Sequence, residues 1–184
     1  MYYKKIEDTY FTLVDYKTGF IDTHIEPMKY GLHMQLPVYL YLAKNSKRLK
    51  NIKVAGFYLQ KVLNNEVSVD KSKTYEQLKK RNLLLQGYSN EDQSILSEFD
   101  TSYADSNIIK SMKVKNDNSF YSYSKVLSDK SMDIIENIAY EKIKEGADLI
   151  TNAKFDISFI EMAMKKFESR KPLFDFQKSA IKTY

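Results

Sequence analysis

The order of hydrophobic patterns near the N-terminus constrains the fold most strongly. The alternation of apolar and polar residues over 2–17 predicts a β-hairpin. An almost wholly apolar helix is predicted from about 28 to about 45, and a second long strand, rich in β-branched and aromatic residues, over 52–63. Strand, crossover helix and strand in this order predict an α/β core in which the two long strands lie side by side.

Pro37 lies inside the predicted apolar helix. Proline lacks the N–H that would bond the carbonyl of His33, so the helix should bend there. We expect such a kink only if the packing around Pro37 tolerates it.

The rest of the chain is less regular. Residues 64–127 form a looser insertion with short helices at 75–82 and 91–98. Ser128 or Ser131 caps a further helix, and a short strand at 155–157 and an amphipathic tail to 167 follow. The apolar stripe of that helix comprises Met132, Ile135, Ala139, Ile143, Ala147 and Ile150.

The composition favours one folded domain. With 184 residues, 43% hydrophobic, and only 5 Gly and 3 Pro, the chain suits a single core rather than modules joined by flexible linkers. We therefore predict one domain over 1–184, made of a core at 1–63, the insertion at 64–127 and a helical part at 128–184.

The absence of cysteine excludes several kinds of site. Disulfides, cysteine nucleophiles, thiolate zinc sites and iron–sulfur clusters all require thiols, and two histidines are too few for a histidine-rich metal site. Any metal is therefore held by oxygen, which favours Mg²⁺ or Mn²⁺. The net charge of +5 is compatible with a phosphate-bearing partner but does not identify one.

The same residues argue against a membrane protein. The longest uncharged run, 30–43, is shorter than the roughly 20 apolar residues that span a bilayer. The N-terminal residues 1–5 do not have the apolar core of a secretory signal, so we expect a cytoplasmic location with no membrane partner.

Asp15 and Lys17 are the first candidate catalytic residues. They share one face of the predicted strand with Phe11 and Leu13, and their Cα atoms should lie roughly 7 Å apart. The Asp15 carboxylate and the backbone carbonyl of Tyr16 could bind a metal, while the Lys17 ammonium orients a water and offsets phosphate charge. The alternative is an ordinary surface pair at a strand end.

Gln35 and Tyr39 are the second candidate pair. They lie four residues apart, so they share one face of an otherwise apolar helix. A buried glutamine amide needs polar partners, because leaving it unpaired costs roughly 1–3 kcal/mol. In the alternative interpretation, Gln35 caps a backbone group and Tyr39 packs in the core with its hydroxyl at the edge.

Two motifs carry a family resemblance. LVDYKTG at 13–19 and YGLHMQLPVYL at 30–40 resemble the DYK(T/S)G and YGLxxQLPxYL signatures of the RecB-family (PD-(D/E)xK) nuclease domain, of the kind found in AddB-type helicase-nuclease subunits. The resemblance implies a restriction-endonuclease-like α/β fold, a mixed sheet flanked by helices. It implies that Asp15 binds the metal, Lys17 is catalytic, and Gln35 and Tyr39 arrange the lysine and the DNA phosphate.

The chain departs from the family at both ends. The family's earlier metal-binding acid, in a Gly-x-Ile-Asp-like strand, is absent, because Glu7 and Asp8 fall where a hairpin turn is expected. We therefore expect Met1 to be an internal methionine of a longer product, or the chain to be a truncated copy. The cysteines that hold an iron–sulfur cluster in AddB-type members have no counterpart in 171–182.

Two functions from different classes follow from this resemblance. The first is metal-dependent hydrolysis of DNA phosphodiester bonds, of the exodeoxyribonuclease type, in repair or recombination. Its partners would be DNA and a helicase-nuclease subunit or the remainder of a longer polypeptide. The second is an inactive or truncated module that binds DNA or a helicase partner through the same fold.

Overall fold

The computed structural model describes residues 2–5, 8–62 and 74–154. The chain divides into two compact units, Met1–Glu141 and Lys142–Tyr184. The first unit contains the sheet and the candidate site. The described part of the second unit is helical up to Thr151, whose hydroxyl donates to the carbonyl of Ala147 at 2.8 Å. One domain over 1–184 stays a prediction.

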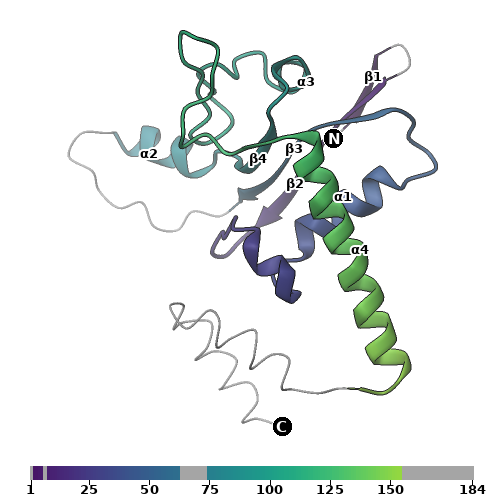
Figure 1. Cartoon of the computed structure of the whole chain (residues 1–184). Helices are drawn as coiled ribbons and strands as arrows, with labels where there is room; N and C mark the ends of the chain where they lie inside the picture. Colours follow the sequence, from purple (N-terminus) through teal and green to yellow (C-terminus); the bar gives the residue numbers. More distant parts are fainter. Residues whose placement is uncertain (1, 6–7, 63–73, 155–184) are drawn as a thin grey trace. The chain divides into compact units, whose positions relative to one another are not determined.

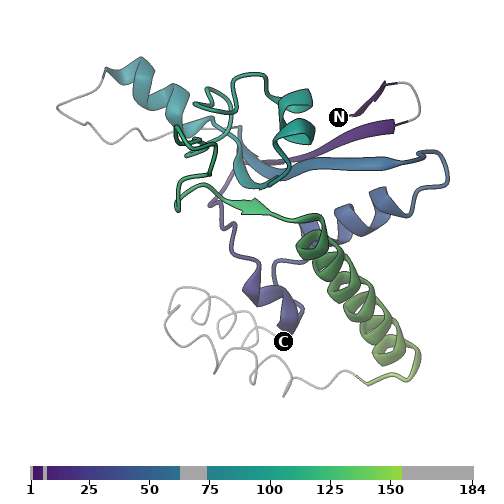
Figure 2. The ribbon, with the colours of Figure 1, turned by 45° about the horizontal axis from the view of Figure 1, so that its top comes forward.

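A mixed five-stranded sheet forms the centre of the first unit, with the strands in the order β1-β2-β3-β4-β5 (Figures 1 and 2). β2 and β3 are parallel, β1 and β4 run antiparallel to their neighbours β2 and β3, and β5 is parallel to β4. The predicted mixed sheet and the adjacency of the two long strands are confirmed. The strands are β1 Tyr2–Lys5, β2 Asp8–Lys17, β3 Ile52–Lys61, β4 Gln86–Asn90 and β5 Val126–Leu127.

Helices cover both faces of this sheet. On one face, α1 and the N-terminal part of α4 share a hydrophobic cluster with β3, and on the other face α3 packs against a second cluster (Figure 2). The helical elements are η1 Glu26–Tyr30 (a 3₁₀ helix), α1 Gln35–Lys44, α2 Tyr75–Asn82, α3 Gln93–Phe99 and α4 Asp129–Thr151.

β3 is the central strand, and both of its faces are buried. Phe57 and Leu59 join the cluster under α1 and α4, while Tyr58 joins the cluster under α3. The pairing with β2 shifts register between Phe11 and Thr12, which face Val54 and Gly56 across the strands. The extra residue on β3, Ala55, is a β-bulge that allows Val54 and Phe57 to face the same cluster.

The predicted helix over 28–45 is wrong in its first half. Gly31 ends η1 with a left-handed backbone (φ 75°), His33 also has a positive φ of 55°, and α1 begins only at Gln35. Pro37 is then the third residue of α1, where a backbone N–H has no partner inside the helix. Pro37 therefore causes no kink, because it lies in the first turn rather than in the helix interior.

The second strand of the predicted hairpin begins earlier than expected, and the looser region holds two unpredicted strands. Asp8 and Thr9 lie in β2 rather than in the turn, and Asp8 pairs with Lys5. Thr9 is buried and its N–H donates to the carbonyl of Asn51 at 3.0 Å. β4 and β5 are too short for a clear alternating pattern, so the pairing of β4 with β3 and of β5 with β4, rather than local sequence, defines them. The two short helices of this region are confirmed, with α3 shifted by two residues at its start.

The predicted long helix is confirmed as α4. Ser128 caps it, because the Ser128 hydroxyl accepts from the N–H of Ser131 at 3.2 Å. Met132, Ile135 and Ala139 are buried as the stripe predicts. The later stripe positions 143, 147 and 150 are exposed. The predicted strand at 155–157 and the amphipathic tail lie outside the described residues.

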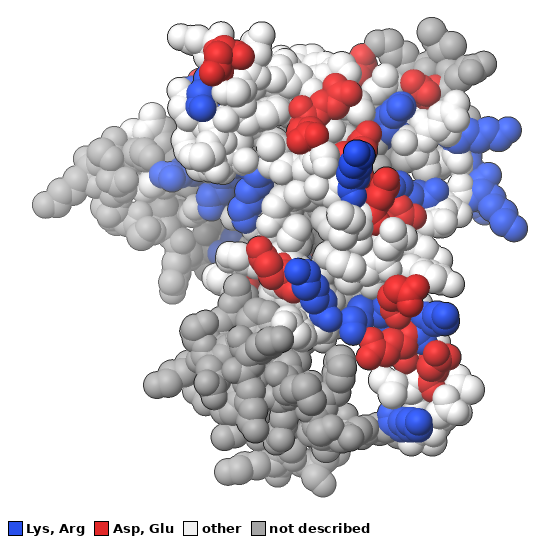
Figure 3. Space-filling model, viewed as in Figure 1, with Lys and Arg blue, Asp and Glu red and all other residues white. Residues whose placement is uncertain are grey.

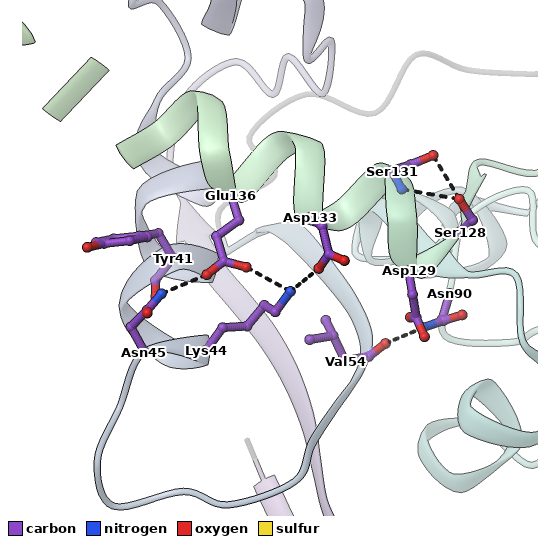
Figure 4. A network of polar contacts seen from close by, with 10 residues as sticks. All are labelled: Tyr41, Lys44, Asn45, Val54, Asn90, Ser128, Asp129, Ser131, Asp133 and Glu136. Carbon is purple, nitrogen blue, oxygen red and sulfur yellow. Dashed lines mark hydrogen bonds and ion pairs between the residues drawn. The ribbon is translucent and has the colours of Figure 1, made fainter. Parts of the chain in front are cut away.

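Polar contacts join α4 to α1 and to the sheet (Figure 4). Lys44, at the end of α1, binds both Asp133 and Glu136 of α4, and its Nζ lies 2.7 Å from Glu136 Oε2. Asn90, fully buried at the end of β4, donates to the carbonyl of Val54 and to the carboxylate of Asp129, each at 2.8 Å. These bonds fix the start of α4 against β3 and β4.

We expect Gly87→Ala to destabilise the protein. A Cβ at Gly87 would lie 2.2 Å from the carbonyl oxygen of Phe57 and 2.8 Å from Cα of Tyr58, both in the backbone of β3, so the two strands would have to separate. Overpacking of this kind costs about 1–3 kcal/mol of unfolding free energy, measurable by urea denaturation. Gly19→Ala is the matched control because nothing lies within 4 Å of its Cβ position; equal effects of the two changes would contradict the prediction.

We expect Lys44→Met to lower the unfolding free energy by about 1 kcal/mol, whereas Lys47→Met, at an exposed neighbouring lysine, should change it little. Burial alone would lower the pKa of Lys44, but hydrogen bonds and charges from Asp133 and Glu136 outweigh it and raise the pKa. The stabilisation is therefore present below about pH 10.4 and lost at higher pH as Lys44 deprotonates. Denaturation of wild type and variant across this range should show their difference shrinking; a constant difference would contradict it.

Candidate active site

The structure brings the four predicted side chains together at the end of β2. Lys17 Nζ lies 2.9 Å from Asp15 Oδ2 and donates a hydrogen bond to Gln35 Oε1. Gln35 Nε2 donates to Asp15 Oδ1 at 3.1 Å and contacts the Tyr39 hydroxyl oxygen at 3.2 Å. Gln35 is thus the hub that links the strand pair to the helix pair, and we call these four residues the tetrad.

Local backbone structure explains this convergence. Strand alternation places Asp15 and Lys17 on one face of β2, and a helix turn places Gln35 and Tyr39 on one face of α1. The break at Gly31 starts α1 at Gln35, so the Gln35 side chain stands at the helix start, next to the strand end. Gln35 is exposed and Tyr39 is 39% exposed, which does not fit a core role for the Tyr39 ring.

Asp15 is the member of the tetrad best suited to a metal. Its side chain is only 15% exposed, and its Oδ2 atom is buried without a hydrogen bond from any described residue, although it forms the ion pair with Lys17. A buried carboxylate oxygen with spare acceptor capacity fits a hard cation such as Mg²⁺. Tyr16, the predicted second oxygen ligand through its carbonyl, lies between Asp15 and Lys17 in β2 with its side chain exposed.

Asp15 is the one acid among the four residues of the tetrad. No group of three or more His, Asp or Glu side chains suited to a metal occurs among the described residues. Asp8 lies on the same strand seven residues earlier, roughly 23 Å away at about 3.3 Å per residue. Glu7 lies outside the described residues. Within the part of the chain described, Asp15 and the backbone carbonyl of Tyr16 remain the predicted metal ligands.

A cavity of about 260 Å³ opens beside the tetrad, and the sequence did not point to it. Lys17 and Gln35 contribute to its wall, and Phe20, Asp22 and Tyr88 are further lining residues. Phe20 follows the strand end directly and is 90% exposed. An aromatic residue directly after the DYKTG motif was the available signal; Tyr88 offered none, because β4 was not predicted.

Both histidines lie at this cavity, although no sequence pattern indicated a functional role for either. His24 Nδ1 contacts Asp22 Oδ1 at 2.5 Å, and the His24 backbone N–H also donates to that oxygen at 2.9 Å. His33 Nδ1 lies 3.3 Å from the carbonyl oxygen of His24. His33 was predicted in a helix but lies in the turn before α1, so its ring reaches the loop of His24 instead.

The fold and the site together define a class of protein. A mixed sheet covered on both faces, with an Asp-x-Lys pair at the end of a central strand, is the arrangement of metal-dependent nuclease domains. The chain belongs to the PD-(D/E)XK nuclease superfamily, whose family model matches residues 5–154.

Within this superfamily, the chain is similar to several curated proteins. The chain is similar to proteins named as subunits of an ATP-dependent helicase/deoxyribonuclease, at 27% identity over 161 residues in Thermoanaerobacter sp. and 32% over 165 residues in Carboxydothermus hydrogenoformans. Each match covers 85% of this chain and 14% of the relative. The chain therefore spans about one seventh of the length of these relatives. Within 2–5, 8–62 and 74–154, no helix combines the length and the apolar character needed to cross a membrane.

We expect a double-mutant cycle to detect the contact between Asp15 and Lys17. Lys17→Met leaves a largely buried carboxylate without its cation, whereas Lys17→Met in an Asp15→Asn background removes no ion pair. The coupling in unfolding free energy should be at least about 0.5 kcal/mol. The same cycle with Lys130→Met, at an exposed lysine at the start of α4, should be additive; additivity in both cycles would contradict the geometry.

Proposed function

We propose that this chain is the nuclease part of a helicase-nuclease and hydrolyses phosphodiester bonds in DNA with Mg²⁺ or Mn²⁺. The convergence of Asp15, Lys17, Gln35 and Tyr39 from two separate elements is the observation that carries this proposal. A structural role alone does not account for it, because an exposed amide and a partly exposed lysine gain little stability from mutual contacts.

Each member of the tetrad has a separate task in this proposal. Asp15 and the carbonyl of Tyr16 would hold the ion, which, when bound, polarises the phosphoryl oxygen and activates water. The Lys17 ammonium neutralises negative charge that develops on the phosphate. Gln35 holds the Lys17 ammonium in place through its carbonyl oxygen, and its amide nitrogen keeps Asp15 and Tyr39 in register with it. The Tyr39 hydroxyl is then available to the phosphate.

The wider setting is part of the same proposal. The relatives are named helicase/deoxyribonuclease subunits, and the chain matches only 14% of their length. We infer an exodeoxyribonuclease-type activity in DNA repair or recombination, in the cytoplasm where the DNA substrate is found. The rest of a longer polypeptide or a partner subunit would supply the helicase and the second metal-binding acid.

One observation favours the second candidate, an inactive module that binds DNA or a helicase partner. The tetrad contains one acid, Asp15, and no group of three or more His, Asp or Glu suited to a metal occurs among the described residues. Charge gives this candidate little further support, because Figure 3 shows Lys and Arg interspersed with Asp and Glu on the face in view, without a continuous basic surface. Cleavage assays decide between the two candidates.

We expect the purified chain, or a version extended upstream, to cleave linear DNA in Mg²⁺ or Mn²⁺ and to stop when a chelator is added. Lys17→Ala should reduce the rate by about 10²-fold or more, because it removes the charge that stabilises the phosphate, and Asp15→Asn should act similarly. DNA affinity, measured separately, should survive Lys17→Ala. Lys130→Ala serves as the matched lysine control and should cleave at the wild-type rate.

Two outcomes would reject parts of this proposal. Failure of both the chain and the extended version to cleave, with DNA binding retained, would favour the inactive module. Cleavage that Lys17→Ala leaves unchanged would remove the tetrad from the chemistry.

A further inference from the structure

The cavity beside the tetrad is lined by two chemically different groups of residues. Lys17 and Gln35 belong both to the tetrad and to the cavity wall, so any occupant of the cavity lies next to the proposed phosphate position. Other lining residues are apolar and buried, among them Pro37, Phe57 and Leu59. The cavity therefore suits a ligand with an anionic end and an uncharged apolar end.

The charges around the cavity indicate where the anionic end and the apolar end of the ligand would lie. A phosphate beside Phe57 and Leu59 would lose water to side chains that offer it no hydrogen bond. The two lining histidines already contact other groups, His24 the Asp22 carboxylate and His33 the His24 carbonyl oxygen. The carboxylate of Asp22 lines the same cavity and would repel a phosphate. Burial raises the pKa of the half-buried Tyr88 hydroxyl, and the negative charges of Glu26 and Asp22 raise it further. The electrostatic potential at Tyr88 is therefore negative. The anionic end therefore belongs at Lys17, and the uncharged end fills the cavity.

Two aromatic side chains suit a flat apolar group. Phe20 lies at the cavity with 90% of its surface exposed, so its ring has a face available to a ligand. Tyr88 has two neighbours that hold it, Phe57 with 5.7 Å between ring centroids and Lys125, whose ammonium lies 5.3 Å from the Tyr88 centroid. Phe20 can therefore adapt to a ligand, while Tyr88 forms a fixed wall.

We propose that this cavity binds one nucleobase of single-stranded DNA, stacked on Phe20, while the adjoining phosphate lies at Lys17. The inference rests on the proposed function and adds to it a base-binding site beside the phosphate position. At about 260 Å³ the cavity is smaller than most sites for drug-sized ligands, which suits a single base. Stacking on Phe20 uses the face of the base rather than its hydrogen-bonding edge, so all four bases are accepted.

Binding without cleavage tests the proposal. The full chain is titrated, with a chelator present, against a fluorescent oligothymidylate and a matched abasic oligonucleotide, and anisotropy gives both affinities. Stacking of one base is worth about 1–3 kcal/mol, so the wild type should bind the base-containing strand at least about fivefold more tightly. Phe20→Ala should abolish this preference and leave binding of the abasic strand unchanged.

Two further variants separate stacking from general effects. Phe20→Trp keeps an aromatic face and should retain the preference for the base-containing strand. Tyr75→Ala removes an aromatic side chain of α2 that is 64% exposed and is not among the cavity residues, so it should retain the preference too. The exposure of Phe20 makes loss of folding an inadequate explanation for a change in Phe20→Ala.

Several results would overturn the proposal. The proposal is wrong if the wild type binds the two strands with equal affinity or binds neither of them. It is also wrong if Phe20→Ala weakens binding of both strands equally. Binding of thymidine monophosphate as tightly as the oligonucleotide would identify a site for free nucleotides instead. The proposed nuclease function is tested separately. A Phe20-dependent preference without metal-dependent cleavage would support the base site and reject the nuclease function. Cleavage without that preference would support the nuclease function and reject the base site.

Discussion

The parallel pairing of β2 with β3 is the constraint on which the rest of the structure depends. A parallel pair needs a crossover connection, and here η1 and α1 provide it. The crossover brings α1 against the same face of the sheet toward which Leu13 and Leu59 point, so the start of α1 meets the end of β2. Burial of β3 on both faces stabilises this pair, and the candidate site forms where the buried strand reaches the surface.

The contacts of the candidate site contribute less to the stability of the fold than the contacts of the core do. Phe57, Tyr58 and Leu40 are fully buried, and their burial supplies hydrophobic stabilisation of roughly 1.5–3 kcal/mol for each large apolar side chain. The contacts of Lys17 and Gln35 are polar and open to water, so they add little stability. In the proposed function, these contacts hold a carboxylate, an ammonium, an amide and a phenol within reach of one phosphate.

Asp15 combines features of both regions. Its strand is anchored by β3, with Asp15 opposite Leu59, yet one of its oxygens has no hydrogen-bond donor among the described residues. A buried carboxylate is costly unless it is paired, and Lys17 provides the one ion pair described for it. The cavity that continues from Lys17 past Phe20 extends the polar site onto an apolar floor, which explains how a single strand end could serve both a phosphate and a base.

The sequence by itself determined the helices and strands whose hydrophobic residues recur with a regular spacing. The alternation around Asp15, the β-branched run of β3 and the stripe of Met132, Ile135 and Ala139 predicted β2, β3 and α4, because these patterns reflect burial of one or both faces. The two motifs identified all four tetrad residues and the family. Local pattern also predicted α2, and in the structure a capping box of Thr74 and Gln77 stabilises its start.

Only the tertiary structure decided the remaining features. The start of α1 depended on positive φ angles at Gly31 and His33, which an apolar run does not reveal. The strands β4 and β5 exist through hydrogen bonds to β3 and to each other, not through their own sequence. The cavity joins Phe20, His33 and Tyr88 from three segments. The spacing of hydrophobic residues in the sequence indicates which face of a segment is buried. The features named here depend instead on which segments contact one another, and only long-range packing determines those contacts.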